Sequence, residues 1–474
     1  MLRIWILLTC LLPLGGCAHY TINPKLDEFS KDTGYRYINL ESEADNSESL
    51  FVILTFSGGG TRAAALSYGV LEKLRDTPIQ WEGKTRRLLD EVDVISSISG
   101  GSFTAAYYGL FRDKTFEEFP ERFLYRDIEG GLKGLLFNPA NWIKLASPNY
   151  GRIDLAADYY DRQIFKGKHF SDLLAQGRRP YLMINATDMS VGAQFTFVQE
   201  SFDLLCSDVA GVPVANAVAA SSNFPVAFTP MTLNNYPNGC RYVSPDWVAL
   251  AHADTALNPS RKYRALLHDS YIGERDTGQG RIKNRPYLHL LDGGVADNIG
   301  LRAPMLAMVS NDPQWSIVSK IDRGEIKKLI VITVDARREP DISNDQRASA
   351  PGLLRVLSSV SSIPLDNYSL DTVELLRTEF DYRRQVRDSW EACGTLLLRN
   401  QCQSSVMPGT GPANTGLYNI YIGFSRVQDP ALQQALYQYP TTFVLDKSQV
   451  DTLREIGGEL LVSDPDFQRL QREL

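Results

Sequence analysis

Ser99 stands where an apolar strand meets a helix, and two glycines follow it. Residues 92–98 read VDVISSI and favour a buried strand, and residues 99–106 read SGGSFTAA and favour a helix that begins at once. A turn this sharp is strained, and a Cβ atom beside the serine would collide with a neighbouring element, which explains the glycines. The pattern is typical of a nucleophile elbow, although an ordinary strand–turn–helix is the alternative.

Apolar strands alternate with helices along the first two thirds of the chain. Such strands need cover on both faces, so we expect an α/β fold with its active residues at the carboxyl ends of strands. Strands are expected at 51–56, 92–98, 181–186, 193–198, 287–291 and 328–335, and helices at 61–75, 99–111 and 213–222.

A glycine-rich loop follows the first of these strands. Residues 57–62 read SGGGTR and precede a helical pattern, so bare backbone N–H groups lie at the positive end of a helix. The loop has no Lys-Ser/Thr pair and no G-x-G-x-x-G spacing, which argues against a nucleotide phosphate. The oxyanion of an acyl-transfer intermediate fits better, with Gly59 and Gly60 as the donors.

An aspartate ends a third apolar strand. Residues 287–294 read YLHLLDGG, so Asp292 lies at a strand end in front of two glycines. A carboxylate in this position is able to accept a hydrogen bond from a hydroxyl group on a neighbouring strand end, although an aspartate also nucleates turns. In an extended strand His289 lies on the opposite face from Asp292, which makes it a poor partner.

In this order, the three motifs resemble those of the patatin-like phospholipases. The stretches 184–197 and 219–230 agree with the same family, so the resemblance covers roughly residues 51–336. It implies a three-layer α/β/α fold with a central, mostly parallel sheet, and the cleavage of lipid acyl esters without a cofactor or a metal. Ser97 and Ala63 stand where the family often has glycine, which bears on rate rather than on reaction class. The site residues carried over are Gly58, Gly59, Gly60, Arg62, Ser99 and Asp292.

The resemblance implies a mechanism in which Asp292 orients and deprotonates Ser99. The serine hydroxyl then attacks an ester carbonyl, and the N–H groups of residues 58–60, aided by Arg62, hold the oxyanion. A structural pairing is the alternative role for Arg62.

Three rival functions remain open. An acyltransferase would use the same dyad with an acceptor other than water. An α/β-hydrolase esterase would need a histidine after the acid, and none of the five histidines follows Asp292. A non-catalytic envelope lipoprotein would keep the fold alone.

The N-terminus resembles the signal sequence of a bacterial lipoprotein. One arginine and a short apolar run lead to LGGC at residues 14–17, which is similar to a lipobox. Cys17 would then carry the lipid and become the mature N-terminus, and an ordinary signal peptide is the alternative. Ala18 resembles the residue found there in outer-membrane lipoproteins. We therefore expect a lipid-anchored protein of the bacterial cell envelope, at the outer membrane, with membrane phospholipids as partners.

The net charge argues against nucleic acid as a partner, and the cysteine content favours disulfides. The formal net charge is −7 and no dense basic run occurs, so there is no electrostatic reason to expect nucleic acid. Beyond Cys10 and Cys17, four cysteines remain, an even number that favours disulfides in an exported protein. Sequence proximity favours the pairs Cys206–Cys240 and Cys393–Cys402.

The chain divides into four expected parts, with two insertions in the third. Residues 112–180 are expected to form a helical subdomain, or a lid or lipid-interface element around 130–145, and residues 241–286 a mobile loop. The C-terminal part is expected to hold helices at 370–390 and 450–461 and strands at 419–424 and 442–445. The four parts are a signal peptide (1–16), a polar tether (17–50), a catalytic domain (51–337) and an α+β extension (338–474).

Overall fold

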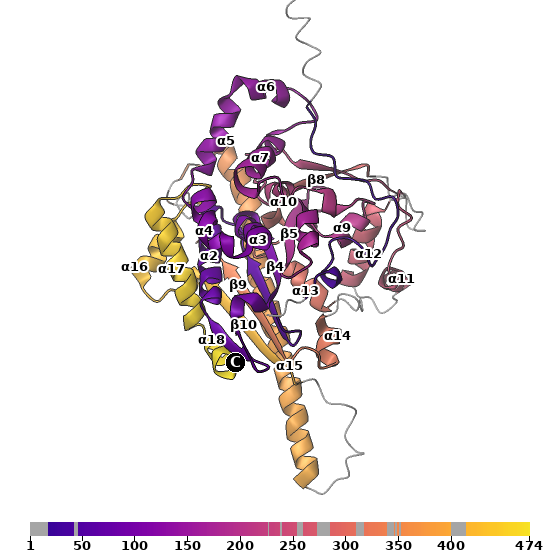
Figure 1. Cartoon of the computed structure of the whole chain (residues 1–474), viewed down its shortest axis with the longest axis vertical. Coiled ribbons are helices and arrows are strands. Elements are labelled where there is room, and N and C mark those ends of the chain that lie inside the picture. Colours follow the sequence, from indigo (N-terminus) through magenta and orange to yellow (C-terminus); the bar gives the residue numbers. More distant parts are fainter. Residues whose placement is uncertain are drawn as a thin grey trace, which may run out of the picture.

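A mixed sheet lies at the centre of the protein, covered by helices on both sides (Figure 1). The computed structural model describes residues 18–41, 46–225, 227–237, 239–253, 259–272, 285–309, 317–338, 346, 348–349, 352–399 and 414–474. Within these residues the sheet has eight strands in the order β10-β9-β1-β4-β5-β8-β7, with β6 paired to β5. Their bounds are β1 (Leu50–Phe56), β4 (Val92–Ile98), β5 (Tyr181–Asp188), β6 (Gln194–Thr196), β7 (Met231–Asn234), β8 (Tyr287–Asp292), β9 (Lys328–Asp335) and β10 (Gly416–Gly423).

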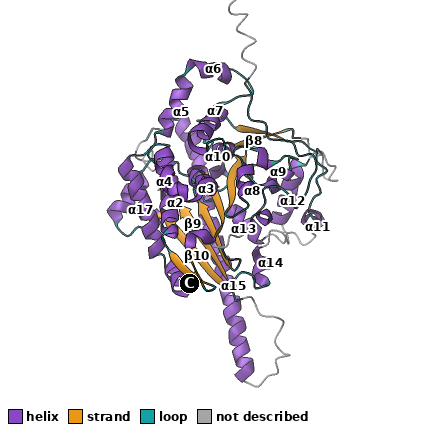
Figure 2. Ribbon diagram, viewed as in Figure 1, coloured by secondary structure: helices purple, strands orange, loops and turns teal. Residues whose placement is uncertain are grey.

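The sheet is parallel from β10 through β5, and its far edge is antiparallel (Figure 2). Every residue of β1, β4, β5 and β9 is buried, as expected of strands covered on both faces. The predicted α/β fold with a mostly parallel sheet is therefore confirmed. The principal helices around it are α2 (Thr61–Arg75), α3 (Ser99–Phe111), α10 (Val214–Ser221), α15 (Leu353–Arg399) and α17 (Lys447–Ser463).

The helical insertion predicted at 112–180 is present, and α5 and α6 form a hairpin at the top of Figure 1. The remaining elements are β2 (Pro78–Trp81), β3 (Lys84–Arg87), α4 (Thr115–Phe119), α5 (Ile128–Phe137), α6 (Pro139–Leu145), α7 (Arg152–Tyr160), α8 (Phe170–Gln176), α9 (Gln199–Asp203), α11 (Asp246–Ala253), α12 (Pro259–Tyr271), α13 (Arg302–Val309), α14 (Ile317–Asp322), α16 (Pro430–Gln438) and α18 (Pro465–Glu473). None of the helices in the described part of the chain is both long and apolar enough to cross a membrane.

The C-terminal part of the chain completes the same sheet. β10 pairs with β9 along its whole length, and α17 packs on α2, where a side chain in place of Gly457 would press against the carbonyl of Leu66. The strand predicted at 442–445 is wrong. The carbonyl groups of Thr442 and Phe443 instead accept hydrogen bonds from the N–H groups of Thr61 and Ile128, across the glycine loop.

The loop predicted at 241–286 is also wrong over the residues that the structure describes. The helices α11 and α12 occupy this stretch, and they pack together through Val248, Ala251 and Ala265. These small apolar residues recur at helical spacing, a signal that the polar composition of the segment obscured. Residues 273–284 lie outside the described residues.

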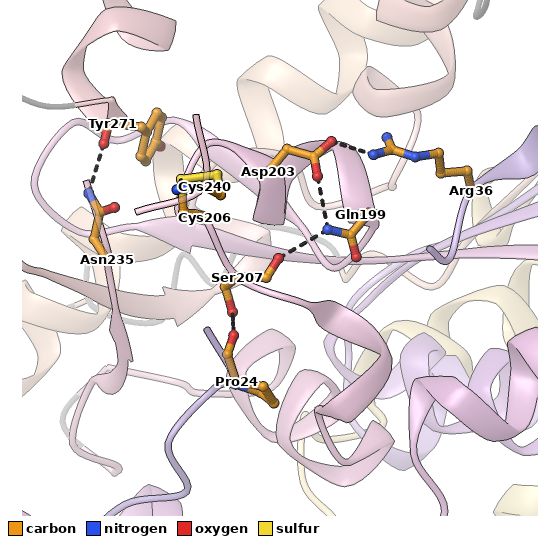
Figure 3. Close-up of a disulfide and its surroundings, with 9 residues drawn as sticks. All are labelled: Pro24, Arg36, Gln199, Asp203, Cys206, Ser207, Asn235, Cys240 and Tyr271. Atoms are coloured by element: carbon orange, nitrogen blue, oxygen red, sulfur yellow. Dashed lines mark hydrogen bonds and ion pairs between the residues drawn. A yellow bond between two sulfur atoms is a disulfide. The ribbon is translucent and has the colours of Figure 1, made fainter. Parts of the chain in front are cut away.

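The N-terminal segment, predicted as a tether, is docked from Ala18 to Glu41. Figure 3 shows its Pro24 beside the predicted disulfide Cys206–Cys240, which is present with an S–S distance of 2.06 Å. The carbonyl of Pro24 accepts a hydrogen bond from Ser207 Oγ at 2.6 Å, and Arg36 pairs with Asp203 at 2.6 Å. Further along the segment, the ring of Tyr35 is fully buried. Aromatic burial and ion pairing therefore hold this segment on the core.

The second predicted disulfide stays a prediction. Cys393 is exposed on α15, and Cys402 lies outside the described residues.

Candidate active site

Ser99 occupies a strained turn between β4 and α3. Its φ angle is +48°, in the left-handed region that side chains other than glycine rarely adopt, so the surroundings must hold the turn in place. A Cβ at Gly100 would overlap the carbonyl of Gly60, and one at Gly101 would lie 2.7 Å from the carbonyl oxygen of Ser57. The glycines after the serine therefore let the elbow sit directly against the glycine loop.

Strand pairing brings Asp292 to Ser99. Ile98 pairs with Asn185 on β5, and the next residue of β5, Ala186, pairs with Asp292 on β8. Both residues are buried, at 8% exposure each, and the Ser99 hydroxyl group lies near enough to the Asp292 carboxyl group to lower its pKa. Two residues that are far apart in the sequence thus lie close together across β5.

The carboxyl group of Asp292 has only neutral hydrogen-bond donors as partners among the described residues. Its Oδ1 accepts the N–H of Gly294 at 2.8 Å, and the Ser99 hydroxyl group lies near it. Burial raises the pKa of Asp292 to about 7, and the Gly294 N–H and the Ser99 hydroxyl group oppose this rise without cancelling it. A carboxyl group with this pKa is half ionised at neutral pH, where it is able both to take up and to release a proton.

Three further residues fix the pair, and the sequence analysis assigned them no role. Ser221 Oγ accepts the N–H of Ser99 at 2.9 Å, and the carbonyl of Asn223 accepts the N–H of Asp292 at 3.0 Å. Thr187 Oγ1 donates to the carbonyl of Asp292 at 2.8 Å. All three lie in the stretches 184–197 and 219–230, which the family resemblance already covered. The resemblance did not predict which contacts these residues make.

The three glycines predicted to bind an oxyanion differ in their contacts. The N–H of Gly58 donates to the carbonyl of Asn298 at 2.9 Å, so it is already engaged. Within the described part of the chain, no acceptor bonds to the N–H of Gly59 or Gly60. Their φ angles are +139° and +62°, and a Cβ at Gly60 would overlap the carbonyl of Thr442. These glycines allow a backbone shape in which Gly60 lies directly against Gly100 of the elbow.

Arg62 extends toward the C-terminal part of the chain. Its guanidinium donates to the carbonyls of Ala336 and Tyr439 at 2.8 and 2.6 Å and to Thr441 Oγ1 at 3.0 Å. The residue is only 2% exposed. These contacts favour the structural alternative for Arg62, in which it joins the start of α2 to residues 439–441, over a direct contact with an oxyanion.

The described histidines lie apart from the Ser99–Asp292 pair. His289 Nδ1 lies 3.2 Å from Thr232 Oγ1, and this ring lines a separate cavity of about 780 Å³. His252 and His268 instead contact Asp269, at 2.8 and 3.2 Å, between α11 and α12. In the described ranges, no group of three or more histidine, cysteine, aspartate or glutamate side chains is arranged to hold a metal ion.

The predicted lipidation residue, Cys17, lies outside the described residues.

The structure thus places Ser99 on a strained turn, with a buried carboxyl group and a glycine-rich loop close by. The sequence profile of the family described as Patatin-like phospholipase matches residues 54–305, which is more than half of the chain. The chain therefore belongs to the patatin-like phospholipases, a family of lipid acyl hydrolases. A comparison with curated proteins gives no significant match.

Several solved structures are similar at low sequence identity. Human GIVD cytosolic phospholipase A2 is 12% identical with a TM-score of 0.37, over 90% of this chain and 60% of that one. The same human enzyme in complex with methyl gamma-linolenyl fluorophosphonate is 12% identical with a TM-score of 0.38, over 92% of this chain and 60% of that one. VipD from Legionella pneumophila is 12% identical with a TM-score of 0.27, over 92% and 71% of the two chains. The present chain thus spans about 60% of the length of the human enzyme.

Proposed function

We propose that this protein is a phospholipase of the A or lysophospholipase type, with Ser99 as nucleophile and Asp292 as the base. The observation that carries the proposal is the proximity of the Ser99 hydroxyl group, on its strained turn, to a buried carboxyl group whose pKa is raised to about 7. An ordinary carboxylate is too weak a base for an alcohol, and burial away from cations makes this one stronger.

The reaction proceeds in two steps that use the same two residues. Ser99 Oγ attacks the ester carbonyl carbon while Asp292 takes the hydroxyl proton, and the leaving alcohol then receives that proton as the acyl–serine ester forms. Water deprotonated by Asp292 attacks this ester, and the fatty acid leaves as the proton returns to Ser99. The N–H groups of Gly59 and Gly60 stabilise the negative oxygen in both steps.

Covalent labelling tests the nucleophile. A fluorophosphonate probe followed by peptide mapping is expected to modify Ser99, and Ser99→Ala to abolish the labelling. Ser97→Ala is the matched control, because Ser97 lies two residues earlier on β4, is buried, and has a hydroxyl without a partner among the described residues. Labelling of another residue, or undiminished hydrolysis by Ser99→Ala, would disprove the assignment.

Two further measurements separate the rival functions. His289→Ala and His268→Ala are expected to keep most of the activity, so loss of turnover in either folded variant would favour a histidine-dependent mechanism. Labelled phospholipid offered with alcohol acceptors distinguishes hydrolysis from acyl transfer, because an acyltransferase would pass the acyl chain to the acceptor rather than to water.

We also propose that a lipid on Cys17 anchors the protein in the bacterial envelope, at the outer membrane. The lipobox-like LGGC and the following Ala18 support this proposal. Mass spectrometry of the N-terminal peptide is expected to find acyl chains on Cys17, and Cys17→Ser to release the protein or leave it unprocessed. Membrane attachment that persists in Cys17→Ser would point to another anchor.

A further inference from the structure

The hairpin of α5 and α6 exposes large apolar side chains at the end of the molecule shown uppermost in Figure 1. Phe137 is 78% exposed, and Trp142 and Ile143 are each 57% exposed. Residues 134–146, which we call the apolar cap, contain a single charged residue, Lys144. A cluster of exposed aromatic and aliphatic side chains with so little charge marks a surface that contacts another apolar body.

The hairpin holds these side chains in a fixed arrangement. Asn138 caps α6 by accepting the N–H of Ala140 at 3.1 Å, and Pro139 occupies the first position of that helix. Trp142 Nε1–H donates to the carbonyl of Leu136 at 2.8 Å, which ties the indole ring of α6 to the end of α5. Since α5 is buried at its first turn through Ile128, the cap is a rigid projection.

The first described residue of the chain lies beside the apolar cap. The carbonyl of Ala18 accepts a hydrogen bond from Ser147 Oγ at 2.5 Å, and Tyr20 N–H donates to the carbonyl of Asn149 at 2.6 Å. Seventeen residues precede Ala18, and the proposed lipid on Cys17 would be attached one residue before this point. Because the segment is docked from Ala18 onward, that anchor would bring this end of the molecule to the bilayer.

The apolar cap also stands above the edge of the sheet that carries the active site. Its inward-facing Leu136 and Leu145 line the cavity of about 780 Å³, together with His289 of β8. Three residues further along the same strand is Asp292. A bilayer in contact with the cap would therefore lie on the same side as the nucleophile.

We infer that the apolar cap inserts Phe137, Trp142 and Ile143 into the surface of a phospholipid bilayer. The inference rests on the proposed function for its membrane substrate and its anchor. Aromatic rings prefer the boundary between head groups and acyl chains, and Lys133 and Lys144 stand near that boundary, where phosphates lie. Insertion would hold the protein against the bilayer in one orientation, with the cavity facing the lipids.

Tryptophan quenching tests the insertion without relying on catalysis. The full-length chain carrying Ser99→Ala is reconstituted in phosphatidylethanolamine–phosphatidylglycerol vesicles whose acyl chains are brominated, and its fluorescence is recorded. We expect Trp142→Phe to remove more than half of the quenching. Trp390→Phe on α15, outside the cap, should leave the quenching unchanged. Quenching that is the same with and without Trp142 would overturn the inference, whether or not Cys17 carries lipid.

A kinetic comparison tests what the insertion does. The double variant Phe137→Asp/Ile143→Asp is expected to hydrolyse vesicle phospholipid at least tenfold more slowly, and a water-soluble short-chain ester at an unchanged rate. The matched control, Leu375→Asp/Leu396→Asp, changes two exposed leucines of α15 and should affect neither substrate. Equal loss on both substrates would contradict the inference. The inference would also be contradicted if the wild-type protein were a dimer and the double variant a monomer. A second copy of the chain, rather than a bilayer, would then cover the cap.

If neither substrate is cleaved by the wild-type protein, the proposed function fails while the quenching experiment still decides the insertion. The two proposals are thus separable.

Discussion

Two buried aspartates, one toward each end of the parallel strands, differ in what their carboxyl groups face. Asp93 lies at the start of β4, where Oδ1 pairs with Arg179 at 2.8 Å and Oδ2 accepts the N–H of Val52 at 2.8 Å. Asp292 lies near the other end of β4 and faces the hydroxyl of Ser99 and the N–H of Gly294. Burial raises the pKa of both groups to about 7, although Arg179 opposes the rise at Asp93.

The comparison teaches that a raised pKa alone does not mark a catalytic acid. The oxygens of Asp93 are both engaged, one of them by a cation, so this residue holds the end of the sheet together. Asp292 has no cation among its described partners, and its carboxyl group faces a hydroxyl on a strained turn. The different roles that we propose for the two aspartates therefore follow from their neighbours rather than from burial.

The largest expected effect is a loss of activity when Asp292, but not Asp93, is replaced by asparagine. Asp292→Asn is expected to lower kcat/KM about 10³–10⁴-fold, because the amide is unable to accept the serine proton. Asp93→Asn should retain most of the activity per folded molecule. Steady-state kinetics on a soluble ester measures kcat/KM for each variant. Circular dichroism checks that each variant is folded. A comparable loss in Asp93→Asn would mean that the two groups do not have separate roles.

The next effect concerns stability. Arg179→Met leaves the Asp93 carboxyl group buried without its cation, so we expect the free energy of unfolding to fall by about 3–5 kcal/mol. Urea unfolding at pH 8 measures this loss. The control is Arg75→Met, whose partner Asp76 is solvent-exposed, with an expected change below about 1 kcal/mol. Similar values for the two variants would remove the structural role given to Asp93.

Asp292→Asn is expected to raise the free energy of unfolding, whereas Arg179→Met lowers it. Because the pKa of Asp292 is raised in the folded protein, the wild-type protein loses stability as pH rises from about 4 through 7, and an amide avoids that loss. Asp292→Asn should therefore be more stable than the wild type by about 4 kcal/mol at pH 8, since each pKa unit corresponds to about 1.4 kcal/mol. The gap should narrow at pH 5. A destabilised variant at pH 8 would show that the Asp292 carboxylate stabilises the fold.

The smallest effect is the pH dependence of catalysis. The base must be ionised to act, so kcat/KM should fall about tenfold between pH 8 and pH 6, with a midpoint near the pKa of about 7. The same midpoint is expected in Asp93→Asn, since that group takes no part in the reaction. A midpoint near pH 4 in the wild type would contradict the raised pKa of Asp292.

The sequence predicted those parts of the molecule whose signals are local. The strands β1, β4 and β9 are mostly apolar, and two glycines follow both Ser99 and Asp292, so these features could be recognised without a structure. The short strand β7 was missed because its four residues are half polar. Residues 442–445 were predicted as a strand because their composition is apolar, although their backbone groups bond to distant partners.

The details of the site depend on contacts that no local pattern encodes. In the sequence Gly58 looks the same as Gly59 and Gly60. In the structure its N–H differs from theirs because it donates a hydrogen bond to the carbonyl of Asn298. Arg62 was predicted beside the oxyanion, yet the partners that orient it lie 377 and 379 residues away in the chain. Such assignments need the three-dimensional arrangement.

The meeting of the glycine loop with residues 439–442 has a consequence for the order of events during biosynthesis. The ribosome makes Ser99 and the loop early, whereas the residues that hold Arg62 and lie against Gly60 are made near the end of translation. A nascent, truncated or partly exported chain thus has its nucleophile but not the finished loop. If Gly59 and Gly60 bind the oxyanion as proposed, the lipid-cleaving site would be complete only after residues 439–442 have been made.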